Sequence, residues 1–205
     1  NRCCRFDGMS NTMRGSAWTQ RAATRAGSLL SGGQLRALAV CSAVGVAAGA
    51  VAAWERIPLG LPGHKALVWM TPIIAARLLA RHRIGATAGT TLAGCSALAL
   101  GGNLAGGALF LPLVTIAGSL LDLTAAFAER HGLTGWRLIA LLALAGGGGN
   151  MLCLIKRLVN ASYRHYAVSG LSGLSACIVS YAVFGLAAGA LGATVGMAGR
   201  LKRQG

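Results

Sequence analysis

Residues 57–83 read Ile-Pro-Leu-Gly-Leu-Pro-Gly-His-Lys-Ala-Leu-Val-Trp-Met-Thr-Pro-Ile-Ile-Ala-Ala-Arg-Leu-Leu-Ala-Arg-His-Arg. Proline and glycine do not easily continue a helix, so the first half is expected to form a turned loop and the second half a helix. Trp69 lies near the start of the apolar run, and a cluster of arginines ends it. Membrane-spanning helices often carry a tryptophan at one membrane interface and arginines at the cytoplasmic one. The stretch therefore predicts a membrane span with its Trp69 end on the outer side.

The composition of the whole chain indicates a membrane environment. Of its 205 residues, 55% are hydrophobic and only 11% are charged, and the mean hydropathy is +0.62. The charges occur in clusters, separated by uncharged runs that approach the roughly 20 residues needed to cross a hydrocarbon core. Several of these runs, taken as helices, have no polar face, which argues against a soluble all-helical protein. The sequence predicts an all-α, polytopic membrane protein.

The charge distribution predicts a six-helix transmembrane bundle with both termini cytoplasmic. Predicted cytoplasmic segments hold 14 Lys and Arg residues and predicted outer segments hold 5, as the positive-inside rule requires. Residues 1–36 form a basic cytoplasmic tail, with either a short surface-lying helix around Trp18–Leu30 or a disordered chain. No cleavable signal peptide is expected. The spans of the transmembrane domain (residues 37–199) are 37–54, 66–80, 84–100, 104–128, 137–155 and about 174–199, followed by a basic tail at 200–205.

The net charge of +15 does not indicate a nucleic-acid partner. Basic residues between spans follow from membrane topology, and no basic helix with interleaved aromatic residues is present. The chain contains no HExxH, GxSxG or Walker motif and only four acids. Four of the six cysteines lie in apolar spans, where they serve as small packing residues, and no His/Cys spacing indicates a metal. We expect a protein without enzymatic activity, metal or cofactor.

Two features inside the spans carry structural expectations. Asp122 is the only acid within a span, which makes it a functional candidate, but a structural ion pair with nearby Arg130 is the favoured interpretation. Residues 146–149 are four consecutive glycines, each of which weakens a helix by up to about 1 kcal/mol relative to alanine. The backbone there is expected either to pack very closely or to unwind beside a cavity.

Aromatic and polar residues converge on the predicted outer side. Aromatic walls with a few polar donors suit a small-molecule pocket, and the basic excess suits an anionic or carbonyl-rich ligand. Interface anchors have the same composition, so that alternative stays open. Lys156 and Arg164 also lie here, against the overall charge bias of the topology. The candidate ligand-binding residues are His64, Lys65, Trp69, Asn103, Asn150, Arg157, Tyr163, His165 and Tyr166.

Several loose patterns recur together in this chain. They are small residues at four-residue spacing in the first span, the loop Leu-Gly-Leu-Pro-Gly-His…Trp (59–69), the run Gly106–Asp122 and the segment Tyr-Ala-Val-Phe-Gly-Leu-Ala-Ala-Gly (181–189). In these features the chain resembles the S component, the substrate-binding membrane subunit, of energy-coupling factor transporters. The resemblance implies a ligand under the outer loops and a transmembrane coupling subunit with ATPases as partners. It also implies docking of that subunit through Ala39, Ala43 and Ala47.

The long basic tail and the glycine run depart from that family's pattern, and they support a second reading. The chain is then a non-catalytic accessory or scaffold subunit of a larger membrane enzyme or energy-transducing complex, buried against partner helices and lipids. The shortage of intramembrane acids weakens a third reading, an ion-coupled carrier. All readings place the protein in the cytoplasmic (inner) membrane as a multi-pass protein.

Overall fold

A computed structural model describes residues 32–54, 61–101, 109–159, 164, 167–168 and 171–202. Residues 36–205 form one compact unit, and the description below concerns this unit. The described chain is almost entirely helical, which confirms the all-α prediction. Its elements are α2 (Gly32–Trp54), α3 (Lys65–Ala80), α4 (Gly85–Ala99), α5 (Phe110–Arg130), α6 (Trp136–Val159), β1 (Ala167–Val168), β2 (Leu171–Ser172) and α7 (Gly173–Leu201).

The helix bounds follow the predicted spans, with several differences. Helix α2 begins at Gly32, so the end of the predicted tail (residues 1–36) is helical, and α6 continues to Val159 rather than ending at residue 155. Helix α5 begins at Phe110 rather than at residue 104, and residues 102–108 lie outside the described residues. A two-stranded antiparallel hairpin, β1–β2, precedes α7 where the sequence predicted a loop or lining segment. Helix α7 continues to Leu201, so the predicted basic tail at residue 200 begins inside a helix. The helix expected around Trp18–Leu30 lies outside the described residues.

Four of the described helices, α2, α5, α6 and α7, are long and apolar enough to cross a membrane. Helices α3 and α4 have 16 and 15 residues, fewer than the roughly 20 that a crossing requires. Many large apolar side chains of the long helices face outward; Leu123 is 69% exposed and Val183 is 54% exposed. Outward-facing apolar side chains of this kind suit contact with lipid tails. The prediction that all six helices cross stays a prediction.

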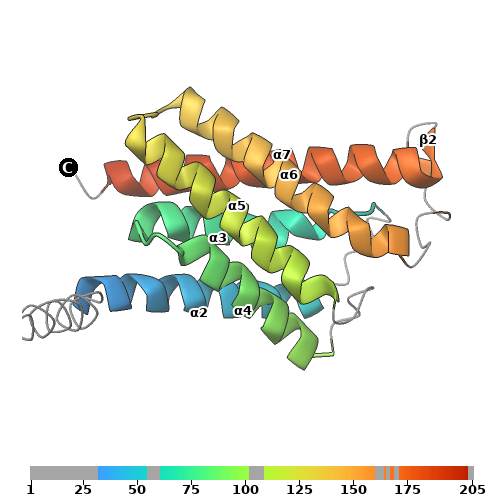
Figure 1. Cartoon of the computed structure of the whole chain (residues 1–205), viewed down its shortest axis with the longest axis horizontal. Helices are drawn as coiled ribbons and strands as arrows, with labels where there is room; N and C mark the ends of the chain where they lie inside the picture. The colour runs from blue at the N-terminus through green and yellow to red at the C-terminus, as the bar shows by residue number, and fades with distance from the viewer. Residues whose placement is uncertain are drawn as a thin grey trace, which may run out of the picture. The chain divides into compact units, whose positions relative to one another are not determined.

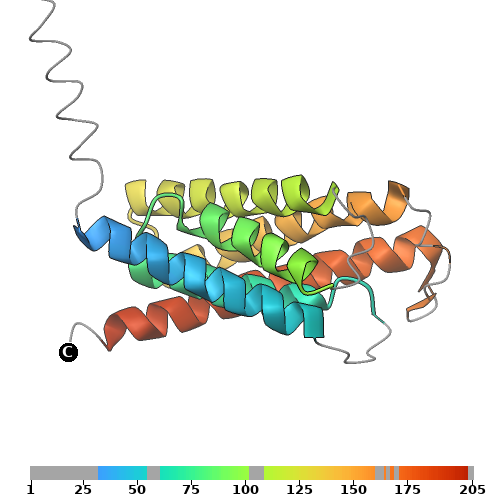
Figure 2. The same ribbon diagram turned by 90° about the horizontal axis from the view of Figure 1, so that it is seen from below.

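The helices alternate in direction. Both views show α3, α5 and α7 running opposite to α2, α4 and α6 (Figures 1 and 2). The C-terminal ends of α3, α5 and α7 therefore share one end of the unit with the N-terminal ends of α4 and α6. The start of α3, the start of α5 and the end of α6 lie together at the opposite end. This arrangement separates the ionised side chains into two groups, described below.

Helix α3 lies at the centre of the core. Met70, Ile73, Ile74 and Leu78 are each at most 2% exposed, and Trp69 is buried beside them. They pack against α7 on one side and α4 on the other. Burying a side chain of this size contributes about 1.5–3 kcal/mol. The stretch from which the orientation of the bundle is predicted therefore also supplies part of its central packing.

The glycine run of α6 is continuous helix, packed very closely against α7. A Cβ atom added to Gly146 would lie 2.5 Å from the carbonyl oxygen of Gly185, and one added to Gly185 would lie 2.6 Å from the carbonyl oxygen of Gly146. Only residues without a side chain permit this approach of two backbones. Of the two expectations for residues 146–149, close packing is confirmed and local unwinding is wrong.

Candidate ligand-binding site

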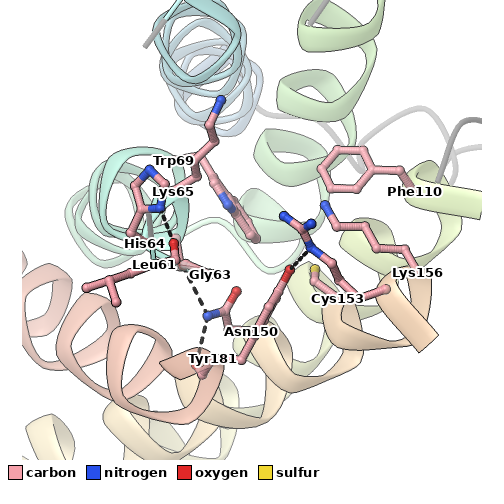
Figure 3. A pocket seen from close by; sticks show the side chains of 12 residues that line it. Leu61, Gly63, His64, Lys65, Trp69, Phe110, Asn150, Cys153, Lys156 and Tyr181 are labelled. Carbon is pink, nitrogen blue, oxygen red and sulfur yellow. Dashed lines mark hydrogen bonds between the residues drawn. The ribbon is translucent and has the colours of Figure 1, made fainter. Parts of the chain in front are cut away.

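A cavity of about 190 Å³ lies where α3 begins, α6 ends and α7 passes (Figure 3). We call it the basic cavity. A 190 Å³ space is slightly larger than the cavity of about 150 Å³ that accommodates benzene in another protein, and smaller than a drug-sized pocket. The described residues that line it are Leu61, Gly63, His64, Lys65, Ala66, Trp69, Phe110, Asn150, Cys153, Lys156, Arg157 and Tyr181.

The segment before α3 is fixed to α6 and α7 by buried polar side chains. The amide nitrogen of Asn150 donates to the carbonyl oxygen of Tyr181 at 2.8 Å and to that of Gly63 at 3.4 Å (Figure 3). The hydroxyl of Ser180 donates to the carbonyl oxygen of Pro62. Gly63 has φ +84°, and an added Cβ would lie 3.0 Å from the Tyr181 ring, so both its conformation and its packing favour glycine. Asn150 directly follows the glycine run, whose close packing against α7 brings the Tyr181 carbonyl within reach of its side chain.

Three cationic side chains meet at the basic cavity. The ammonium of Lys65 donates to the carbonyl oxygen of Ala52 on α2 at 2.8 Å, and that of Lys156 lies 4.4 Å from the Phe110 ring centroid. The Nε of Arg157 donates to the Tyr181 hydroxyl at 3.4 Å. None of the described lining residues is acidic. Three cationic side chains at one cavity suit an anionic ligand, because its oxygens can accept charge-assisted hydrogen bonds from them.

The structure brings together five of the nine predicted ligand-binding residues. His64, Lys65, Trp69, Asn150 and Arg157 all line the basic cavity, although they come from two segments far apart in the sequence. The other four candidates, Asn103, Tyr163, His165 and Tyr166, lie outside the described residues. Lys156 and Arg157, which run against the charge bias of the predicted topology, lie in the last turns of α6 and face this cavity.

The sequence interpretation missed Phe110, Cys153 and Tyr181 as lining residues. The sequence predicts Phe110 inside a span, whereas it is the first residue of α5 and contacts Lys156. Tyr181 is 3% exposed and is the only tyrosine in α7. A polar aromatic residue within an otherwise apolar run was the signal that could have identified it, because a buried hydroxyl needs a partner.

Comparisons with family models, with curated proteins and with solved structures find no match for this chain. The resemblance to transporter S components therefore rests on the patterns quoted above.

A second group of ionised residues lies at the other end of the helices. Asp122, 5% exposed, forms an ion pair with Arg77, whose Nε lies 2.8 Å from its Oδ1. Glu129 lies 3.2 Å from Nη1 of Arg77 and 3.8 Å from Nη2 of Arg200. The structural role expected for Asp122 is thus present, but Arg130 as its partner is wrong. Eight residues along a helix rise about 12 Å, which places Arg130 beyond reach of Asp122.

Asp122 also closes the start of α4. Its Oδ1 accepts a hydrogen bond from the backbone N–H of Ala86 at 3.1 Å, and its Oδ2 accepts one from that of Thr87 at 2.7 Å. The Thr87 hydroxyl donates to Oδ2 as well, at 2.8 Å. The first N–H groups of a helix lack partners within the helix, and the helix dipole favours a negative charge there. Asp122 therefore joins α3, α4 and α5 through a single carboxylate.

The two rows of small residues on α2 face different ways. Gly45 and Gly49 are buried against α4, where added Cβ atoms would lie 2.2 Å from the carbonyl oxygens of Gly89 and Ala93 respectively. The second row, Ala39, Ala43 and Ala47, is exposed along the opposite part of the helix. We call these three residues the alanine row. Docking of a partner through the alanine row stays a prediction.

Proposed function

We propose that this protein is a membrane-embedded substrate-binding subunit that captures a small anionic molecule in the basic cavity. It would work as the S component of an energy-coupling factor transporter does, handing its ligand to a coupling subunit and ATPases. The observation that carries the proposal is the convergence of Lys65, Lys156 and Arg157 on one cavity that has no acid among its described lining residues. Trp69 and Phe110 supply the aromatic walls that such a site requires.

The proposed topology has six crossings of the cytoplasmic membrane, with both termini on the cytoplasmic side. Arg81, Arg130, Arg137 and Lys202 all belong to the end that holds the Asp122 ion pair. The positive-inside rule assigns this end to the cytoplasm. The basic cavity, at the opposite end, then faces the outside and meets its ligand before transport.

Three solutes of matched size test the charge preference. Benzoate, benzamide and benzamidine share a ring that suits the cavity volume and carry negative, zero and positive charge. We expect only benzoate to raise the unfolding temperature of the detergent-purified protein, because a ligand that binds the folded state stabilises it, by about 2.7 kcal/mol at a hundred times its Kd. Thermal unfolding followed by intrinsic fluorescence measures the shift.

Two variants assign the effect to the cavity. Lys156→Gln and Arg157→Gln should each weaken benzoate binding about tenfold, the value expected for one lost charge-assisted hydrogen bond. Arg130→Gln removes a cation from an exposed position at the other end of the unit and should leave binding unchanged. Equal shifts with all three solutes, or benzoate binding that survives both cavity variants, would refute the proposal.

The partner proposal concerns the alanine row. Replacing Ala43 by Leu places a bulky side chain on its exposed face and should prevent close approach of a partner helix. We expect loss of co-purifying membrane subunits from native membranes, with normal yield of the chain itself. Ala140→Leu makes the same exchange at an exposed position of α6 and serves as the control. An undiminished complex from the Ala43 variant would exclude the alanine row as the interface.

The scaffold alternative predicts that different subunits co-purify with the chain. The exposed alanine row suits a helix of a membrane enzyme complex equally well, so the partner's identity decides between the two functions. Recovery of two nucleotide-binding subunits and a coupling subunit favours the transporter. Recovery of redox or other enzyme subunits, together with no response to benzoate, favours the scaffold.

A further inference from the structure

A second, smaller cavity adjoins the basic cavity. It has a volume of about 60 Å³ and lies among α2, α3, α4, α5 and the end of α6. Four side chains line both cavities: Lys65, Trp69, Phe110 and Lys156. These four side chains therefore form the junction between the two spaces. We call the smaller one the apolar cavity.

The linings on the two sides of this junction differ in chemistry. Beyond the shared residues, the basic cavity presents His64, Asn150, Arg157 and Tyr181. The apolar cavity presents Gly49, Ala52, Thr90, Ala93, Gly94, Ala97 and Val114. Its one hydroxyl, that of Thr90, already donates to the carbonyl oxygen of Thr87 at 3.1 Å. That side consequently offers a ligand almost only apolar surface.

We infer that the ligand is a small amphipathic anion, with its charged head held at Lys65, Lys156 and Arg157 and a short apolar chain in the apolar cavity. This inference rests on the proposed function and names the class of molecule that would be captured. A carboxylate suits this group of cations because its two oxygens can accept several charge-assisted hydrogen bonds. An apolar tail gains free energy from leaving water, in proportion to the area that it buries.

The volume limits the tail to a few carbons. The apolar cavity has 60 Å³, less than half of the roughly 150 Å³ that accommodates a six-carbon ring. Val114, 1% exposed, and Ala97, 3% exposed, form part of its wall. Both belong to the packed core, so a longer chain would have to displace them. A tail of two to four carbons, in order-of-magnitude terms, fits this space.

A series of unbranched carboxylates measures the length of the tail. The probes are the sodium salts of acetate, propanoate, butanoate, pentanoate, hexanoate, octanoate and dodecanoate, titrated into the full chain in detergent by calorimetry. Affinity should rise about fourfold with each added methylene until the apolar cavity is full, and then fall. The amines of the same chain lengths control for partition into detergent, and they should show no such optimum.

Two variants move the optimum in opposite directions. Ala97→Val narrows the apolar cavity and should favour a shorter acid, whereas Val114→Ala widens it and should favour a longer one. Either variant alone tests the inference should the other fail to fold. Neither residue lines the basic cavity, so both should bind benzoate as the wild type does.

The outcomes separate this inference from the proposed function. Benzoate binding with a flat carboxylate series, or with an optimum that neither variant moves, overturns the amphipathic ligand alone. Failure of both benzoate and every carboxylate to bind overturns the proposed function as well. Dodecanoate binding as tightly as the best short acid would show a groove for lipid chains, which also overturns the inference.

Discussion

Replacing Asp122 by Asn should lower the free energy of unfolding by about 3 kcal/mol, the largest effect that we expect from a single exchange in this protein. The exchange keeps the volume of the side chain and removes its charge, so Arg77, 2% exposed, stays buried without its nearest counterion. Breaking a buried ion pair in this way costs about 3–5 kcal/mol. The lower end of that range applies because Glu129 remains 3.2 Å from Nη1 of Arg77. Unfolding in mixed micelles of increasing denaturing detergent measures the change.

Two matched variants show whether charge is the cause. Glu129→Gln removes an acid whose side chain is 43% exposed, and it should cost less than about 1 kcal/mol. The double variant Arg77→Met with Asp122→Asn removes both buried charges, while the amide oxygen of Asn can still accept from the N–H of Ala86 or Thr87. It should therefore be more stable than Asp122→Asn alone, because no unpaired buried charge remains. An Asp122→Asn protein as stable as the wild type would show that the ion pair does not hold α3, α4 and α5 together.

The second large effect concerns the glycine run of α6. Gly146→Ala should destabilise the protein by about 1–3 kcal/mol, because the new methyl group would lie 2.5 Å from the carbonyl oxygen of Gly185 and force α6 and α7 apart. The same unfolding measurement applies.

Gly148 provides the control within the same run. An added Cβ there meets only Cδ2 of Leu120, at 3.4 Å, an ordinary contact distance. Gly148→Ala should therefore be neutral or stabilise the helix by up to about 1 kcal/mol. Similar losses from both variants would mean that helix α6 needs flexible backbone at the run, and that close contact with α7 is not the reason for its glycines.

The sequence was informative wherever a long apolar run or a cluster of charges decided the structure. Six apolar runs predicted the six described helices, because uncharged stretches of this length have few other structures available. The ends were less well determined. The start of α5 at Phe110 and the β1–β2 hairpin depend on contacts of the connecting segments, which leave little periodic signal.

The candidate site was predictable in part for a related reason. Charge and aromatic content identified Lys65, Trp69 and Arg157, since both ends of the predicted spans were already assigned. Tyr181 and Phe110 were not identified, because the face that a residue presents within an apolar helix depends on its neighbours in space. The prediction of Arg130 as the partner of Asp122 was wrong for the same reason. Arg77 is 45 residues away from Asp122 along the chain, and only the packing of α3 against α5 brings the two together.

On our proposal, the basic cavity holds a small anion. Native mass spectrometry of the protein, extracted from its own membranes in mild detergent, tests this most directly. We expect the wild type to carry a bound anionic small molecule that dissociates on activation, and the Lys156→Gln variant to carry markedly less of it. A wild-type protein that carries only lipid, or a small molecule that the variant retains in full, would contradict the account.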